Sequence, residues 1–187
     1  MRFVEKAHSF ISKHLLSGDT CIDATAGNGH DSLLMAKLVT SEGKLFAFDI
    51  QSNALTQTRN LLIKNNCMSQ SKLIQECHSV MKNSLDLKFK GKIKVVTFNL
   101  GYLPCGDHKI TTKKDTTIEA IKGIYDWIHE SGVISLVAYR GHIGGIEETR
   151  GIQKFLETKK FNYRREEIQN NPNSPVFFRI YKSERGN

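Results

Sequence analysis

The chain has 187 residues, of which 39% are hydrophobic and 25% charged, as is ordinary for a globular domain, and no apolar run approaches the roughly 18 residues that a membrane span needs. Twenty-seven Lys and Arg against 19 Asp and Glu give a net charge of +8, which favours polyanions such as nucleic acid, an anionic membrane or a phosphorylated ligand; the alternative is a basic protein that its charge keeps in solution. We therefore expect a single domain over residues 1–187 with no membrane partner.

Apolar spacing and turn residues predict helices that alternate with strands along the chain. The predicted helices cover residues 3–16, 30–39, 52–65 with Ser52 as the N-cap, 116–130, and a last segment that follows the glycines of 141–145 and ends near 158. The predicted strands cover residues 20–24, 44–49, 72–75, 93–98 and 132–138, and a closing antiparallel hairpin covers 161–168 and 176–181. This alternation is typical of an α/β fold with a mostly parallel sheet.

A glycine-containing loop, Asp23-Ala24-Thr25-Ala26-Gly27-Asn28-Gly29-His30-Asp31, joins the first strand to the helix after it. Its two glycines allow a tight turn against which a ligand can lie, and the helix N-terminus offers unpaired N–H groups. Asp49 ends the second strand, where a carboxylate can accept both hydroxyls of a ribose. Together these features predict a site for a nucleoside-containing cofactor, whereas the loop alone could be a plain turn that needs glycine.

The residues around the loop distinguish between cofactors. Ser32 stands where a dinucleotide fingerprint has its third glycine, and no Gly-Lys-Ser/Thr follows as a Walker A motif requires. Asp23 and Asp31 would repel a pyrophosphate, but they suit the sulfonium and ammonium groups of S-adenosylmethionine (SAM). The sequence therefore favours SAM.

A second candidate segment, Asn99-Leu100-Gly101-Tyr102-Leu103-Pro104, opens the polar loop 99–115 after the fourth strand. In a doubly wound sheet the fourth strand lies beside the first, so this segment faces the reactive end of the cofactor. The Asn99 carbonyl can accept the protons of a target amine, and Tyr102 can stack on a nucleobase. The alternative is a β-turn with an incidental aromatic residue.

These two segments, together with Asp107-His108 and the segment from Tyr139 to Glu148, resemble the small bacterial "putative rRNA methylase" family over essentially the whole chain. The resemblance implies a Rossmann-like class I SAM-dependent methyltransferase whose seven strands have the order 3-2-1-4-5-7-6. Characterised members of that family methylate the aminomethyl group of 5-aminomethyl-2-thiouridine at the tRNA wobble position. Cys105 and Arg140 depart from the family pattern, where Gly and Pro are more usual.

The resemblance also implies roles for individual residues. The cofactor residues would be Asp23, Gly27, Asn28, Gly29, Asp31, Asp49, Gln51, Cys77 and His78. The catalytic and substrate side would comprise Asn99, Tyr102, Asp107, His108, Tyr139 and His142. Asp107, His108 or solvent would take the amine proton, and because the Asp107-His108 pair lacks a third ligand we expect no metal.

Basic residues near this side can hold the phosphates of an anticodon stem. They are Lys109, Lys113 and Lys114 in the loop, and Arg164 and Arg165 on the hairpin. The prediction is thus a SAM-dependent methyltransferase acting on the anticodon stem-loop of tRNA. The alternatives are an rRNA or small-molecule methyltransferase and, from another class, a non-catalytic RNA-binding protein.

Cysteine usage and the N-terminus bear on location and assembly. The four cysteines, at 21, 67, 77 and 105, show no CxxC spacing, which indicates reduced thiols and not a disulfide framework. Residues 1–8 lack the apolar region of a secretory signal, so we expect a cytoplasmic protein. A homodimer is compatible with the sequence, which does not define the oligomeric state.

Overall fold

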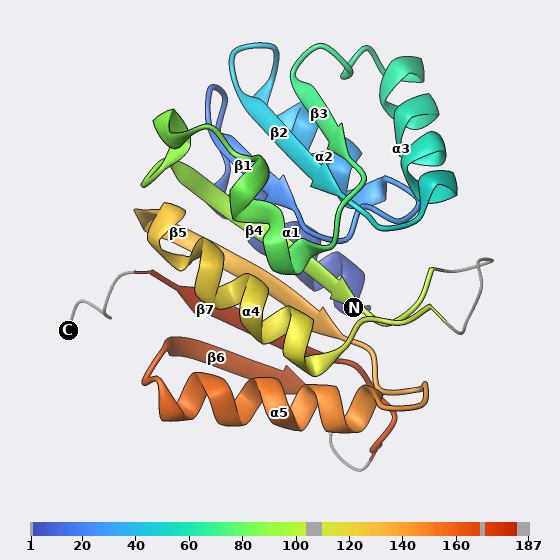
Figure 1. Ribbon diagram of the computed structural model, residues 1–187, viewed down its shortest axis with the longest axis vertical. Coiled ribbons are helices and arrows are strands. Elements are labelled where there is room, and N and C mark those ends of the chain that lie inside the picture. Colours follow the sequence, from blue (N-terminus) through green and yellow to red (C-terminus); the bar gives the residue numbers. More distant parts are fainter. Residues whose placement is uncertain (1, 104–109, 169–170, 183–187) are drawn as a thin grey trace.

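The computed structural model describes residues 2–103, 110–168 and 171–182 and has one sheet between two layers of helices (Figure 1). The sheet order is β3-β2-β1-β4-β5-β7-β6, and β7 is antiparallel to both of its neighbours while the other described pairs are parallel. The strands are β1 (Thr20–Asp23), β2 (Lys44–Phe48), β3 (Ser71–Ile74), β4 (Ile93–Leu100), β5 (Ile128–Ala138), β6 (Asn162–Glu167) and β7 (Val176–Tyr181). The predicted fold class, strand order and closing hairpin are confirmed.

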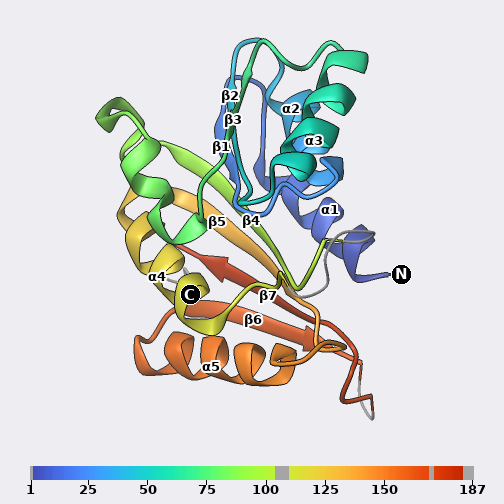
Figure 2. The same cartoon turned by 45° about the vertical axis from the view of Figure 1, so that its right-hand side comes forward.

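The helices divide between the two faces of the sheet (Figures 1 and 2). On one face lie α1 (Phe3–His14), α2 (His30–Val39) and α3 (Ser52–Lys64). On the other lie the 3-10 helix η1 (His78–Ser84), α4 (Lys114–Ile124) and α5 (Gly145–Thr158). The short 3-10 turns η2 (Leu87–Phe89) and η3 (Tyr125–Trp127) precede β4 and β5.

Alternating strand residues build the two hydrophobic cores. In β2, Leu45 and Ala47 pack with α1, α2 and α3, whereas Phe46 and Phe48 pack with η1, α4 and α5. All four are buried, so this strand is apolar on both faces, as expected of a central parallel strand covered by helices. A one-residue shift in register would exchange the two sets, so the side-chain volumes of both cores specify the register.

The helix predicted over 116–130 is shorter in the structure. It begins at Lys114 and ends at Ile124, and β5 begins at Ile128, which pairs with Ile93 of β4. Trp127 and Ile128 continue the helical spacing of the buried Ile121 and Ile124, so periodicity alone extends the helix too far. Strand pairing with β4 supplies the hydrogen bonds that end it.

Two local predictions at the ends of elements are also corrected. Asn99 lies inside β4, where it pairs with Val137, and does not open the loop, because β5 continues beside it and extends the ladder to Leu100. Ser52 is the first residue of α3, and the N-cap is Gln51, whose side chain makes no capping bond. The Gln51 N–H instead donates to the Asp49 carboxylate at 2.9 Å.

The strand order places the candidate residues at one edge of the sheet. The chain order reverses between β1 and β4, which are hydrogen-bonded neighbours in the centre of the sheet. In open α/β sheets ligands bind outside the carboxyl ends of the strands at such a reversal. The glycine loop follows β1, Asp49 follows β2, and Asn99 lies near the end of β4, so the three meet at that edge.

Gly29 should be indispensable to this arrangement. It has φ +83°, and a Cβ there would lie 2.8 Å from the Cα of Thr58 on α3, whereas Gly18 has the same φ and nothing within 4 Å. We expect Gly18→Ala to cost about 1 kcal/mol from the left-handed backbone, and Gly29→Ala to cost about 1–3 kcal/mol more from the clash. Urea unfolding of both variants measures the difference. Equal costs would show that α3 yields and that its contact with the loop is not fixed.

Candidate active site

A cavity of about 800 Å³ opens at the carboxyl edge of β1, β2, β4 and β5. Its wall on one side comes from the glycine loop and the segments after β2 and β3, and on the other from the segments after β4, β5 and β6. The size is within the range of sites that hold a cofactor and part of a substrate. The first wall carries the carboxylates Asp31, Asp49 and Glu76, which favour a cationic ligand there, whereas Lys113 and Arg140 line the other wall.

The Asp49 carboxylate holds the glycine loop against β2. Its Oδ2 accepts the N–H of Gly27 at 2.9 Å, and its Oδ1 accepts the N–H of Gln51 at 2.9 Å. Gly27 has φ +53°, a left-handed conformation that glycine adopts without strain. Each carboxylate oxygen has a second lone pair, so Asp49 can fix the loop and still accept a ligand hydroxyl.

Asp31 lies at the centre of a polar cluster that joins α1, α2 and β4. Its Oδ1 contacts Nε2 of His8 at 2.7 Å, and its Oδ2 accepts Nδ2 of Asn99 at 2.7 Å. The Thr97 hydroxyl donates to the same Oδ2 at 3.5 Å. Because Nδ2 of Asn99 is turned to Asp31, the carbonyl Oδ1 is the atom of that amide left to accept a bond from a ligand.

The pKa values of the two aspartates in this cluster shift in opposite directions. Burial opposes ionisation of Asp31, but the hydrogen bonds from His8 and Asn99 outweigh it and hold its pKa below the usual value. Burial, and then the Asp31 charge, raise the pKa of Asp23, which lies fully buried beneath the loop and accepts the Ser32 hydroxyl at 2.6 Å. The hydrogen bond to Asp31 raises the pKa of His8.

The cavity wall after β3 contains Cys77 and His78. Burial lowers the pKa of His78 to about 4, although a bond with the Ala24 backbone opposes the shift, so its imidazole is neutral near pH 7. Its Nε2 is buried and has no hydrogen-bond partner among the described residues. A buried polar atom without a partner is costly, and in a cavity wall it marks a position where a ligand can bond.

The opposite wall is formed by the segments that follow β4 and β5. The Tyr102 ring packs edge-on against His142 with centroids 6.0 Å apart. Thr112 donates its N–H to the Gly101 carbonyl at 2.9 Å, and Tyr102 forms a β-bridge with Thr111, so residues 101–102 and 111–112 lie side by side. The Tyr139 side chain approaches Asp31, whose charge adds to burial in raising the pKa of that phenol.

Glu148 secures this wall from behind. It lies in the first turn of α5, is buried, and accepts the hydroxyls of Thr112 at 2.8 Å and Thr117 at 3.0 Å. Burial raises the pKa of its carboxyl, and the two threonine bonds oppose the rise. The bonds tie the end of the post-β4 loop and the start of α4 to α5.

The structure brings most of the predicted site residues to the cavity. Those that line it are Gly27, Asn28, Asp31, Asp49, Gln51, Cys77, His78, Asn99, Tyr102, Lys113, Tyr139 and His142. Asp23 is buried at the end of β1 and Gly29 packs against Thr58 of α3, and neither residue lines the cavity. Asp107, His108 and Lys109 lie outside the described residues.

The remaining basic residues lie elsewhere. The Lys114 side chain lines a groove between α4 and α5 and pairs with Asp115 at 3.4 Å, so it faces away from Lys113. Arg164 and Arg165 lie on β6 and do not line the cavity, and Arg165 pairs with Glu167 at 2.8 Å. Consecutive residues at the start of a helix point in different directions, which the sequence-based grouping of the two lysines did not consider.

Two contributors were missed by the sequence analysis. His8 is one of several polar residues on an amphipathic helix, and Glu148 follows an acidic neighbour in a first helical turn. Neither has a local signal, because each acquires its role from a residue more than 20 positions away. The capping preference for acidic residues in first turns explains Glu148 equally well without the two threonines.

The comparisons with known proteins agree with this geometry. The chain is 36% identical to a plant protein named tRNA (mnm(5)s(2)U34)-methyltransferase, chloroplastic, from Arabidopsis thaliana, over 96% of this chain and 69% of that one. It is 36% identical, with TM-score 0.90 and 97% of each chain covered, to a "putative rRNA-methylase" structure from Clostridium thermocellum. It is also 30% identical, with TM-score 0.83, to a "putative methyltransferase" from Streptococcus mutans solved with S-adenosylhomocysteine (SAH), covering 97% and 98% of the chains.

The sheet order, the site at its carboxyl edge and these relatives define the class of protein as a class I SAM-dependent methyltransferase. The family model described as "Putative rRNA methylase" matches residues 45–182, and the chain belongs to that family. The predicted family, enzyme class and cofactor are thereby confirmed. No helix within the described residues is long and apolar enough to cross a membrane.

The His8–Asp31 pair should make stability depend on pH. The pKa of His8 is raised in the folded protein, so the pair stabilises the fold fully below the unfolded histidine pKa of about 6.5, and that contribution is lost as the pH rises through the folded value. We expect His8→Gln to lower the free energy of unfolding by up to about 1 kcal/mol more at pH 5.5 than at pH 8.5, since the pair is partly exposed.

Urea unfolding at both pH values measures this difference. His14→Gln is the matched control, because His14 lies on the same helix and bonds the Phe10 carbonyl oxygen in place of a carboxylate. The same pH dependence in both variants would attribute the effect to general charge rather than to Asp31.

Proposed function

We propose that this protein transfers a methyl group from SAM to the aminomethyl nitrogen of 5-aminomethyl-2-thiouridine at the wobble position of tRNA. The observation that carries the proposal is the meeting, in one cavity, of the Asp49-bound glycine loop with Asn99 and Tyr102. The name of the 36% identical Arabidopsis relative and the net charge of +8 support tRNA as the substrate.

The residues present fit SAM. The carboxylates in the wall suit its cationic groups, and the buried Nε2 of His78 provides a bonding position beside the glycine loop. Asp49 and Gln51 would hold the ribose and the adenine edge, and Cys77 and His78 would border the adenine. Gly27, Asn28 and Asp31 would surround the methionine part. Asp23 and Gly29 do not line the cavity and would act indirectly, by fixing the conformation of the glycine loop.

When bound, SAM supplies an electrophilic methyl group with its own leaving group, so the protein mainly aligns the reactants. Asn99 would do this through Oδ1, which accepts an N–H of the target amine and turns the nitrogen lone pair toward the methyl group. Asp31 fixes that amide through Nδ2. Tyr102, which is 40% exposed at the cavity, would stack on the nucleobase.

The amine must attack in its neutral form, and the methylated product must then lose one proton. Asp107, His108 or solvent would accept that proton, and both residues lie in the sequence between Tyr102 and Thr111, which form a β-bridge. Tyr139 and His142 would complete the substrate side. Lys113 would contact phosphate near the cavity mouth, whereas Lys114 faces the groove between α4 and α5.

The role of Asp49 can be tested by SAM binding. Asp49→Ala removes a charged acceptor of ribose hydroxyls and should weaken SAM affinity about ten-fold or more, since such bonds contribute about 1.5–3 kcal/mol. Isothermal calorimetry on the folded variant measures it. Asp115→Ala is the control, because Asp115 is an exposed carboxylate outside the cavity. An Asp49→Ala protein that binds SAM as tightly as wild type would remove Asp49 from the cofactor site.

The substrate can be tested with an anticodon stem-loop RNA. Purified protein and SAM should methylate a stem-loop with 5-aminomethyl-2-thiouridine at the wobble position and leave one with 2-thiouridine unmodified, because the latter has no amine nucleophile. Transfer to rRNA but not to the aminomethylated stem-loop would preserve the enzyme class and overturn the substrate.

The salt dependence of RNA binding should separate the two lysines. Lys113→Ala should reduce the slope of log K against log salt by about one unit, because one phosphate contact is lost, and Lys114→Ala should leave the slope nearly unchanged. Filter binding from 50 to 200 mM salt measures both slopes. A larger effect of Lys114→Ala would place the RNA over the α4–α5 groove instead of the cavity.

A further inference from the structure

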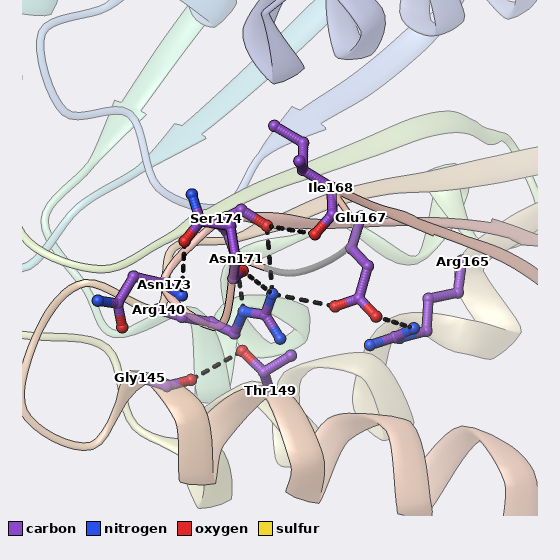
Figure 3. Close-up of polar contacts among 9 residues, drawn as sticks. All are labelled: Arg140, Gly145, Thr149, Arg165, Glu167, Ile168, Asn171, Asn173 and Ser174. Carbon is purple, nitrogen blue, oxygen red and sulfur yellow. Dashed lines mark hydrogen bonds and ion pairs between the residues drawn. The ribbon is translucent and has the colours of Figure 1, made fainter.

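Arg140 connects two loops that are far apart in the sequence (Figure 3). It follows the end of β5, and its Nε donates to the Ser174 carbonyl at 2.6 Å. Its Nη2 donates to the Asn171 carbonyl and the Ser174 hydroxyl, both at 3.3 Å, and pairs with Oε2 of Glu167 at 3.0 Å. All three partners lie in the segment that runs from the end of β6 toward β7.

Two of these partners, Asn171 and Ser174, belong to the segment Asn171–Pro175, which has a defined shape and forms part of the cavity. The Ser174 N–H donates to the Asn171 carbonyl at 3.0 Å, and the Asn173 N–H donates to the Asn171 side chain at 3.1 Å. Asn173 and Pro175 line the cavity opposite the cofactor residues, and Arg140 itself lines it from the β5 side. Arg140 therefore holds together two parts of the substrate wall.

We propose that Arg140 is a positioning residue for the acceptor RNA, and that the Asn171–Pro175 segment it holds is a substrate-contacting wall of the cavity. The inference rests on the proposed function, because it takes the acceptor to be RNA. The exposed Asn173 offers an amide donor and acceptor, and Pro175 offers an apolar face, a combination that suits a nucleoside edge beside the target base.

The alternative role for Arg140 is a direct phosphate contact, and its surroundings argue against it. Only 12% of its side chain is exposed. Its charge faces Glu167, whose pKa is held below the usual value by Arg165 and then by Arg140. A phosphate would have to replace partners that already use the planar guanidinium at several positions.

The first test compares two arginines that share Glu167. Arg140→Gln should raise the KM for the aminomethylated stem-loop about ten-fold while the SAM dissociation constant, measured by calorimetry, stays within about two-fold of wild type. Arg165→Gln removes the other partner of Glu167 but no contact with Ser174, and should leave both constants near wild type. A wild-type KM in Arg140→Gln would overturn the proposal.

In the second test, the two roles of Arg140 predict opposite changes in the KM for the stem-loop. Glu167→Gln weakens the ion pair that orients Arg140, so the positioning role predicts a higher KM for the stem-loop, whereas a phosphate-contacting Arg140 freed of its carboxylate predicts a lower one. Amide hydrogen exchange at Ser174 should quicken in Arg140→Gln, because the carbonyls that fix the segment lose their donors. Unchanged exchange, or a lower KM in Glu167→Gln, would overturn the proposal.

Asn173→Ala tests the wall without removing a partner of Arg140, and because Asn173 is exposed we expect the variant to stay folded. It should raise the KM several-fold with SAM affinity unchanged, and a wild-type KM would overturn contact at this wall. A wild-type protein that methylates no aminomethylated stem-loop would instead overturn the proposed function, and this inference with it. The wild-type rate therefore distinguishes the two failures.

Discussion

The buried carboxylate of Asp31 is the interaction on which the site depends. An ionised carboxylate removed from water is stable only when charged or polar donors surround it. Here His8 of α1 and Asn99 of β4 supply those donors at 2.7 Å each, and neighbouring Asp23 accommodates the charge through a raised pKa. Through these bonds one carboxylate fixes the relative positions of α1, α2 and β4 at the cavity.

The two halves of the cavity are built differently. In the cofactor half, backbone N–H groups are held by a carboxylate: Asp49 accepts hydrogen bonds from Gly27 and Gln51. The glycine loop also packs against α3 at Gly29. The substrate half consists of long segments after β4, β5 and β6, held by buried side chains such as Glu148 and Arg140. This division suits an enzyme with a constant cofactor and fits the proposal that its acceptor is an RNA.

Much of the fold follows from local pattern. Apolar strand segments that alternate with amphipathic helices, together with the glycine loop, predict the order of strands and helices. The acidic residue at the end of β2 predicts a nucleoside site beside that loop. The end of α4 is the main error, because Trp127 and Ile128 fit both a helical face and a strand. Only pairing with β4 distinguishes a helix from a strand at these residues. Pairing between strands distant in the sequence cannot be predicted from neighbouring residues alone.

The candidate site likewise contains residues that local sequence pattern predicts and residues that it does not. The grouping of residues at the carboxyl ends of β1, β2 and β4, such as Gly27, Asp49 and Asn99, could be predicted because the topology of a doubly wound sheet brings strand ends together. His8 and the partners of Arg140 could not, because their contacts depend on how a helix and a hairpin pack. The side chains of Lys113 and Lys114 reach different sites although the residues are adjacent, because consecutive residues at the start of a helix point in different directions.

The account is tested most directly by mass spectrometry of modified tRNA nucleosides from cells that lack the gene. It predicts that the deletion strain accumulates 5-aminomethyl-2-thiouridine and loses the methylated nucleoside, and that a plasmid copy of the wild-type gene restores it. An Asn99→Ala copy, which removes the proposed amine acceptor together with one donor to Asp31, should restore little. Unchanged tRNA nucleosides in the deletion strain would contradict the account and leave the cofactor fold without this substrate.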